Sequence, residues 1–185
     1  MTTTSTIVAG MLQFLHPLFF DTNVEVNRAE IECLATNIYF EAAAEERLGK
    51  TAVAHVTLNR LHDPAYEHSV CNVVVESFAP GTKSCQFSWT CDGKPDEVPV
   101  DTRAGARTYE DCVEEAIFAY FGLTKDPTGG ATYYYAFNLV DPKWAHTGKI
   151  KETVVIGNHR FMADKDDIRR HNNPVVSLLV QASYP

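Results

Sequence analysis

The sequence predicts an α+β protein, mostly α, folded as a single domain with a small β element late in the chain. Segments rich in Ala, Glu and Leu fill the earlier part, whereas aromatic and β-branched residues alternate after Gly129-Gly130. A length of 185 residues suits one domain, and no internal repeat divides it. We expect the domain at residues 27–165, with an N-terminal extension at 1–26 and a C-terminal tail at 166–185 packed on it.

Two predicted helices form a hairpin at the start of this domain. The first covers residues 27–46, where Asn27 and Glu30 make a capping pattern and Gly49 marks the end. The second covers residues 50–62, whose apolar positions recur at helical spacing.

A third helix and three extended segments follow. The helix is predicted to begin near Thr108, a favourable N-cap residue, and to end at Gly122. The aromatic stretch 132–139 has the period of a strand, and residues 153–162 read as a hairpin whose turn is Gly157-Asn158.

Charge and hydropathy exclude several classes of partner. The chain has 24 acidic and 16 basic residues, so we expect no nucleic-acid partner, because Lys and Arg supply most affinity for phosphates. The apolar stretch 7–20 contains polar interruptions and is too short to span a bilayer, so we expect no membrane insertion. It lacks the flanking residues of a cleaved leader. We also expect a monomer.

Two acids are predicted to share one face of the first helix. At about 100° per residue, Glu41 falls beside Leu34 and Glu45 falls near Ile38. Burial and a neighbouring like charge disfavour ionisation, so one of these acids can stay protonated near neutral pH, as a general acid must. The predicted water-facing stripe lies opposite and contains Glu32, Thr36, Tyr39, Ala43 and Glu46. The alternative is that the two acids form ion pairs with Arg28, Arg47 or Arg60.

Residues suited to sugars gather in two segments. Aromatic faces bind the C–H surfaces of sugars, while amides and carboxylates bind the hydroxyls. The candidates are Gln86, Phe87, Ser88, Trp89 and Asp92 in one loop, and Tyr133, Tyr134, Tyr135 and Trp144 later in the chain. The alternative is that Phe87 and Trp89 fill the core beneath a long loop. Three adjacent tyrosines cannot all be buried.

The sequence supports metal and thiol chemistry less well than it supports sugar binding. The spacing of Cys85 and Cys91 does not suit a zinc knuckle, and we expect no metal and no cofactor. Five cysteines leave at least one thiol free in a monomer. If a disulfide forms, we expect it among Cys71, Cys85 and Cys91, bracing residues 86–89, whereas Cys33 and Cys112 lie in predicted helices. Five reduced cysteines are an equal alternative, and a cysteine nucleophile beside His55, His146 or His159 also stays open.

Several short motifs occur in one order along the chain. Residues 39–45 read Y-F-E-A-A-A-E, and residues 52–60 read A-V-A-H-V-T-L-N-R after Gly49. Later come S-V-C at 69–71, Q-F-S-W at 86–89, D-G at 92–93, G-A-T at 130–132, W-A at 144–145 and G-N-H-R-F at 157–161. Together they resemble the SleB-type cell wall hydrolases, which include spore cortex-lytic enzymes and related phage and bacterial proteins.

The resemblance implies a lysozyme-like, lytic-transglycosylase-type fold, peptidoglycan glycan strands as substrate and Glu41 as the catalytic acid, with Glu45 tuning or orienting it. Its motifs add Thr132 and His159 to the substrate-binding candidates. Two departures stand out. The R-G of the family motif is Ala43-Ala44 here, which alters the electrostatics around Glu45, and the histidines that often flank the A-T segment are Tyr133 and Tyr135.

The choice between a hydrolase and a transglycosylase depends on whether a second carboxylate lies opposite Glu41. A hydrolase needs a second carboxylate across the bond from its acid. Glu45 is expected on the same side as Glu41, which leaves Asp92 and Asp141. We therefore hypothesise a lytic transglycosylase that cuts between N-acetylmuramic acid and N-acetylglucosamine and leaves 1,6-anhydro ends. The alternatives are a catalytically weak peptidoglycan-binding protein and a thiol-dependent amidase or peptidase.

The biological setting is inferred from the same features. A short chain without a leader or a wall-binding repeat favours a phage endolysin that stays in the host cytoplasm until lysis and then acts on the wall. A secreted or periplasmic bacterial protein is the alternative.

Overall fold

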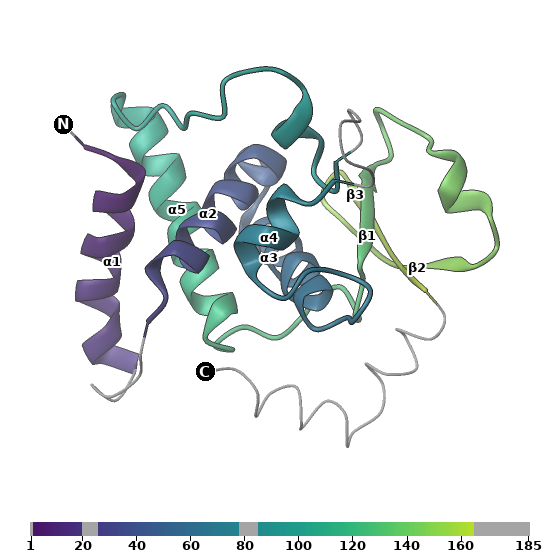
Figure 1. Cartoon of the computed structure of the whole chain (residues 1–185), viewed down its shortest axis with the longest axis horizontal. Coiled ribbons are helices and arrows are strands. Elements are labelled where there is room, and N and C mark those ends of the chain that lie inside the picture. Colours follow the sequence, from purple (N-terminus) through teal and green to yellow (C-terminus); the bar gives the residue numbers. More distant parts are fainter. Residues whose placement is uncertain (1, 20–25, 78–84, 165–185) are drawn as a thin grey trace.

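A computed structural model describes residues 2–19, 26–77 and 85–164, so the predicted tail at 166–185 lies outside the described residues. The helices gather on one side of the molecule and a three-stranded sheet lies on the other (Figure 1). The elements in order are α1 Thr4–Phe19, α2 Arg28–Ala42, α3 Arg47–Leu61, α4 Val70–Val75, the 3-10 turn Ser88–Cys91, α5 Arg103–Tyr120, β1 Tyr133–Ala136, the 3-10 turn Lys143–His146, β2 Ile150–Ile156 and β3 His159–Asp164.

Helix α2 runs through the middle of the helical half, and its side chains Ile31, Leu34 and Ile38 are fully buried. Helix α1, which the sequence did not predict as a helix, buries apolar side chains in the same core and packs against α5. The predicted water-facing stripe of α2 is confirmed only in part, because Glu46 is exposed whereas Glu32, Thr36, Tyr39 and Ala43 are half-buried. The hydroxyl of Thr36 lies 3.2 Å from that of Tyr109 on α5, because α1 and α5 cover this face.

The predicted capping of α2 is confirmed, because Asn27 Oδ1 accepts a hydrogen bond from the backbone N–H of Glu30. The predicted end is wrong, since the helix stops at Ala42 and Glu45 lies in the turn beyond it. The local sequence is all Ala and Glu, which favours continuing the helix. Two contacts hold the chain beyond this end: Lys50 Nζ, five residues along the chain, donates to the backbone oxygen of Glu45 at 2.6 Å, and the distant turn at Asn158 binds the Glu45 side chain.

Helices α3 and α5 both begin earlier than predicted. Gly49 lies inside the first turn of α3, where a Cβ would approach Glu45 Cβ to 2.7 Å, so glycine permits close packing rather than ending α2. Thr102, not Thr108, caps α5 by accepting a bond from the N–H of Gly105. The predicted end of α5 is confirmed, because Gly122 follows it with a φ of 68°.

The sheet has the strand order β1-β3-β2 and is antiparallel throughout. The predicted hairpin at residues 153–162 is confirmed, with Gly157-Asn158 as its turn. One face carries Phe161 and Ile156 and packs against Ala52 and Val56 of α3, forming a second apolar cluster. Tyr134 and His159 lie on this same face, because they pair with or alternate from Phe161 in the register.

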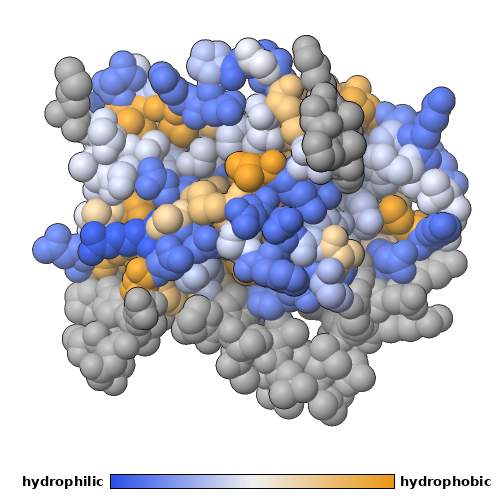
Figure 2. All heavy atoms as spheres, in the orientation of Figure 1, coloured by the Kyte–Doolittle hydropathy of each residue, from blue (hydrophilic) through white to orange (hydrophobic). Residues whose placement is uncertain are grey.

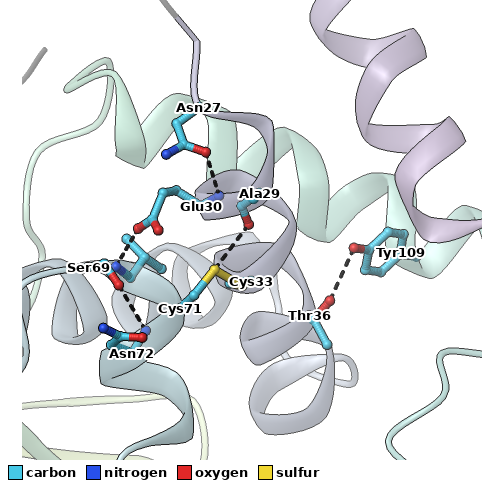
Figure 3. Close-up of a disulfide and its surroundings, with 10 residues drawn as sticks. Asn27, Ala29, Glu30, Cys33, Thr36, Ser69, Cys71, Asn72 and Tyr109 are labelled. Carbon is cyan, nitrogen blue, oxygen red and sulfur yellow. Dashed lines mark hydrogen bonds between the residues drawn. A yellow bond between two sulfur atoms is a disulfide. The ribbon is translucent and has the colours of Figure 1, made fainter.

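Two disulfides are present, and Cys112 is the free cysteine, buried in α5. Cys85–Cys91 encloses residues 86–89, as predicted. Cys33–Cys71 was not predicted, because Cys33 was placed inside a helix, yet α4 packs against α2 at that point (Figure 3). Figure 3 also shows Glu30 beside the N-terminus of α4, where its carboxylate accepts a bond from the N–H of Val70.

The surface shows no dominant apolar region on the face in Figure 2, where small hydrophobic groups alternate with hydrophilic side chains. Within residues 2–19, 26–77 and 85–164, no helix has both the length and the apolar character needed to cross a membrane.

Candidate active site

Glu41 lies in the last turn of α2, where the helical half meets the sheet. Its side chain is half-buried and is approached by Arg60 of α3 and Tyr134 of β1. The Tyr134 hydroxyl is buried and faces the carboxyl, although it has no partner within full hydrogen-bond geometry. Three elements that are distant in sequence thus converge on one carboxyl group.

Burial raises the pKa of Glu41 above its usual value of 4.5, while the Tyr134 hydroxyl and the positive charge of Arg60 lower it to a smaller extent. The net effect on the pKa is upward, as expected for a carboxyl removed from water. The alternative of an ion pair is wrong for Glu41 among the described residues. Arg47 pairs with Glu114 and Glu115 instead, and Arg60 acts through its charge from beyond ion-pair distance.

Arg60 is a buried cation that sequence reasoning considered only as an ion-pair partner. It is 4% exposed, its Nε donates to the backbone oxygen of Thr132 at 2.8 Å, and its guanidinium lies 4.7 Å from the Phe87 ring and 5.6 Å from the Tyr66 ring. The sequence contains a signal for this role, because Arg60 lies four residues after Val56 and continues the row of Ala52 and Val56 that faces the sheet. A charge in an apolar row is a candidate functional residue.

The loop 85–93 brings Trp89 to α2. Its ring stacks on Phe40 at 4.4 Å, next to Glu41 in the chain, and its Nε1–H donates to Asn37 Oδ1 at 2.9 Å. Asn37, which sequence reasoning missed, is fully buried and donates in turn to Thr57 Oγ1. Trp89 remains half-buried, so one part of its ring is available beside the site.

The other residues predicted in this loop have different environments. Phe87 is 2% exposed and supports Arg60, as the core alternative predicted, whereas Ser88 is exposed. Gln86 is half-buried and hydrogen-bonds Glu76. Asp92 is exposed in the Asp-Gly turn, where the N–H of Lys94 lowers its pKa. Substrate contact by these residues stays a prediction.

The predicted tyrosines divide between the two faces of the sheet. Tyr134 faces Glu41, while Tyr133 and Tyr135 lie on the other face, each with its ring 5.6 Å from Trp144. Tyr135 is buried and Tyr133 is half-buried. Thr132 is buried, and its backbone oxygen holds Arg60.

Glu45 does not share the surroundings of Glu41. Its side chain is 10% exposed and accepts hydrogen bonds from Asn158 Nδ2 at 2.9 Å and from the N–H of Asn158 at 3.4 Å. Its Oε1 lies 3.7 Å from Nδ1 of His159. Gly157 has a φ of 55°, and a Cβ there would overlap Glu45 Oε2. The turn of the β2–β3 hairpin therefore encloses this carboxylate.

The described structure does not favour thiol chemistry. Four of the five cysteines are in disulfides, and burial raises the pKa of the Cys112 thiol to about 12. A cavity of about 330 Å³ lies on the other side of Glu45, but it does not reach Glu41. Its lining consists of Glu45, Glu46, Arg47, Lys50, Asp111, Glu114 and Glu115. In the described part of the chain, no cluster of His, Cys, Asp and Glu has the arrangement of a metal site.

Residues 44–162 match the protein family described as Cell Wall Hydrolase, a range that begins just after Glu41, includes Glu45, Arg60 and Trp89, and ends within β3. The chain belongs to this family. It is similar to the spore cortex-lytic enzyme of Halalkalibacterium halodurans, with 32% identity over 143 residues, which are 76% of this chain and 37% of that protein. The spore cortex-lytic enzyme of Bacillus cereus is 32% identical over 133 residues, covering 71% of this chain and 43% of that protein. The chain thus spans about two fifths of the length of these curated relatives.

A solved structure supports the fold. The catalytic domain of the germination-specific lytic transglycosylase SleB from Bacillus anthracis is 27% identical, with a TM-score of 0.50. The match covers 76% of this chain and 98% of that domain. Together with the mostly helical architecture and the small sheet, it confirms the predicted lysozyme-like α+β fold class and the SleB-type family.

Proposed function

We propose that this chain degrades peptidoglycan by cleaving the β-1,4 bond between N-acetylmuramic acid and N-acetylglucosamine, with Glu41 as the catalytic acid. One observation carries the proposal: Glu41 is a half-buried carboxyl with a raised pKa, which favours the protonated form that leaving-group protonation requires. The family match and the names of the relatives point to the same substrate.

The reaction we propose is that of a lytic transglycosylase. Glu41 gives its proton to the glycosidic oxygen, the bond from that oxygen to C1 of the muramic acid breaks, and positive charge develops at C1. The oxygen of the muramic 6-hydroxyl then bonds to C1, and its proton passes to the Glu41 carboxylate. The product is a 1,6-anhydro sugar, no water is consumed, and Glu41 is again protonated.

The surroundings of Glu41 suit a group that acts first as acid and then as base. Burial favours the protonated form, whereas Arg60 and the Tyr134 hydroxyl favour the carboxylate that remains after proton transfer. These opposed influences bring the two protonation states closer in free energy, which suits proton transfer in both directions.

The positions of the other carboxylates favour a transglycosylase over a hydrolase. Glu45 is enclosed by the hairpin turn, Asp92 is bound to Lys94, and Asp141 is bound to His146 at 2.6 Å on the surface. The structure adds Glu76 as one further candidate for the second carboxylate of a hydrolase. Burial raises the pKa of Glu76, and the positive charge of Arg60 acts on both Glu76 and Glu41.

Mass spectrometry of the digestion products tests this reaction. We expect muropeptides that are lighter than hydrolytic products by one water and that resist borohydride reduction at the muramic end, with no product from Glu41→Gln. Reducing muramic ends would instead indicate a hydrolase and direct attention to Glu76, Asp92 and Asp141. Wall binding without any product from the wild type would support the peptidoglycan-binding alternative.

We also propose that the enzyme works in an oxidising compartment at the cell wall, because disulfides such as Cys33–Cys71 and Cys85–Cys91 persist there. A role in host lysis predicts reduced cysteines while the host is intact and two disulfides after lysis. An exported bacterial enzyme has both disulfides while the producing cell is intact. Alkylation of thiols in intact cells, before and after lysis, distinguishes these two settings.

A further inference from the structure

Tyr134 connects the surroundings of the two glutamates. Its hydroxyl faces Glu41, and its ring is packed among three others: His159 edge-on at 5.3 Å, Phe161 at 5.6 Å and Phe87 at 6.5 Å. Rings on several sides leave the Tyr134 side chain few alternative rotamers.

Among these neighbours, His159 has a buried polar atom without a hydrogen-bond partner. It begins β3 directly after the hairpin turn, its side chain is 9% exposed, and its Nδ1 has no hydrogen-bond partner. The charged group nearest to that nitrogen is Glu45, at 3.7 Å, which also binds the neighbouring Asn158 through two hydrogen bonds. Glu45 therefore holds the turn through Asn158, and its carboxylate lies beside the ring that follows the turn.

We propose that Tyr134 is a positioning residue for Glu41, and that Glu45 acts on the same carboxyl indirectly by holding the 157–159 turn so that His159 packs against Tyr134. The inference rests on the proposed function of Glu41. It assigns Tyr134 and Glu45 a shared task, orienting the acid: Tyr134 faces the Glu41 carboxyl directly, and Glu45 acts through His159.

The groups around Glu41 make the proposed positioning measurable as a change in the pH dependence of activity. Tyr134 faces the carboxyl from β1 and Arg60 faces it from α3, with Glu45 and His159 behind Tyr134 and Glu76 on the side of Arg60. The Tyr134 hydroxyl favours the carboxylate form. Without this hydroxyl, Glu41 keeps its proton to a higher pH, so the alkaline limb of the activity profile moves upward.

Tyr134→Phe tests the first half of the proposal, because it removes the hydroxyl and keeps the ring. On a soluble glycan substrate we expect kcat to fall by about 10-fold or more, KM to stay within about 2-fold, and the alkaline limb to move to higher pH. Tyr109→Phe is the matched control, since it removes a buried hydroxyl that lies beside Thr36 and does not act on the Glu41 carboxyl, and it should leave the limb in place. A rise in KM with an unmoved limb would make Tyr134 a substrate-binding residue and overturn the proposal.

Glu45→Gln tests the second half. We expect a smaller upward movement of the alkaline limb, and no further movement when Glu45→Gln is added to Tyr134→Phe, because both changes act through the same hydroxyl. Glu115→Gln is the matched control, a buried acid held by Arg47 and Thr51 away from Tyr134. Additive movements of the limb in the double variant would contradict the indirect route through His159.

These results separate the inference from the proposed function. If Glu41→Gln retains wild-type turnover, the assignment of the acid is wrong and the proposal falls with it. If Glu41→Gln is inactive while Tyr134→Phe and Glu45→Gln keep the wild-type pH profile, the acid stands and only the positioning role is wrong. Should Tyr134→Phe fail to fold, Glu45→Gln against Glu115→Gln still decides the question.

Discussion

Glu41 and Glu45 are four residues apart, yet their surroundings differ in almost every respect. Glu41 lies among rings and one buried cation, with no hydrogen bond from a backbone amide among the described residues. Glu45 accepts hydrogen bonds from the backbone N–H and the side-chain amide of Asn158, and the His159 ring lies nearby. The contrast teaches that the chemistry of each acid in this motif depends on its surroundings. Burial favours the protonated form of Glu41, whereas the Glu45 carboxylate is occupied by hydrogen bonds from Asn158.

The largest expected effect separates the two acids by turnover. Glu41→Gln should lower kcat by about 10³-fold, since general acid catalysis contributes about 10² to 10⁴. Glu45→Gln should lower it by only about 10-fold, because Glu45 acts through position. The measurement is release of soluble muropeptides over time, with folding checked by circular dichroism. Equal losses in the two variants would abolish the distinction between them.

The sequence predicted Glu41 as the acid but not the position of Glu45. The helical wheel placed both acids on one face because residues 27–46 favour a helix throughout, and no local signal ends it at Ala42. The chain beyond Ala42 is held by Lys50 and by the 157–159 turn, and the second contact depends on the tertiary fold, which local periodicity does not record. Asn37 was missed for a related reason, since the Trp89 indole that it binds lies on a loop whose placement depends on the whole fold.

The fold itself was predictable where patterns were long. The capped start of α2, the end of α5 and the late hairpin all follow from periodicity and turn residues, and the structure confirms them. Helix α1 was missed because its apolar stretch was weighed only as a membrane segment, and α4 was missed because six residues carry too little periodicity. The strand order β1-β3-β2 depends on long-range pairing that composition does not encode.

The disulfides sharpen the comparison, because Cys33–Cys71 fastens the helix of Glu41 whereas the Glu45 turn has none nearby in sequence. A closed loop of 38 residues is worth about 4 kcal/mol of unfolding free energy, and one of 6 residues about 2 kcal/mol. We expect losses of that order in urea denaturation for Cys33→Ser/Cys71→Ser and Cys85→Ser/Cys91→Ser. Thiol counting under denaturing conditions should find one free thiol before reduction, from Cys112; five free thiols would show that neither disulfide forms.

A glycine pair tests whether the turn encloses Glu45 as tightly as the geometry indicates. Gly157→Ala should cost about 2 kcal/mol or more, since it adds strain at positive φ to an overlap with Glu45 Oε2, and activity should fall as in Glu45→Gln. Gly148→Ala is the matched control, because its φ is 75° but no atom lies near its Cβ position. It should cost about 1 kcal/mol and leave activity unchanged. Equal behaviour of the two variants would mean that Glu45 is held loosely.

The smallest expected effect concerns how the ionisation of Glu41 changes the free energy of unfolding with pH. Its folded pKa lies above the usual 4.5, so the stability it contributes is full below about that pH and is lost as pH rises through the folded pKa. Gln does not titrate, so Glu41→Gln should gain stability relative to the wild type as pH rises from about 4 to about 8, by about 1.4 kcal/mol for each pH unit that separates the folded pKa from the usual one. Urea denaturation at several pH values measures this difference, and Glu110→Gln, an exposed acid on α5, controls for removal of one charge. A difference that shrinks as pH rises would mean that the fold lowers the pKa of Glu41, and would remove the reason for assigning the catalytic proton to Glu41.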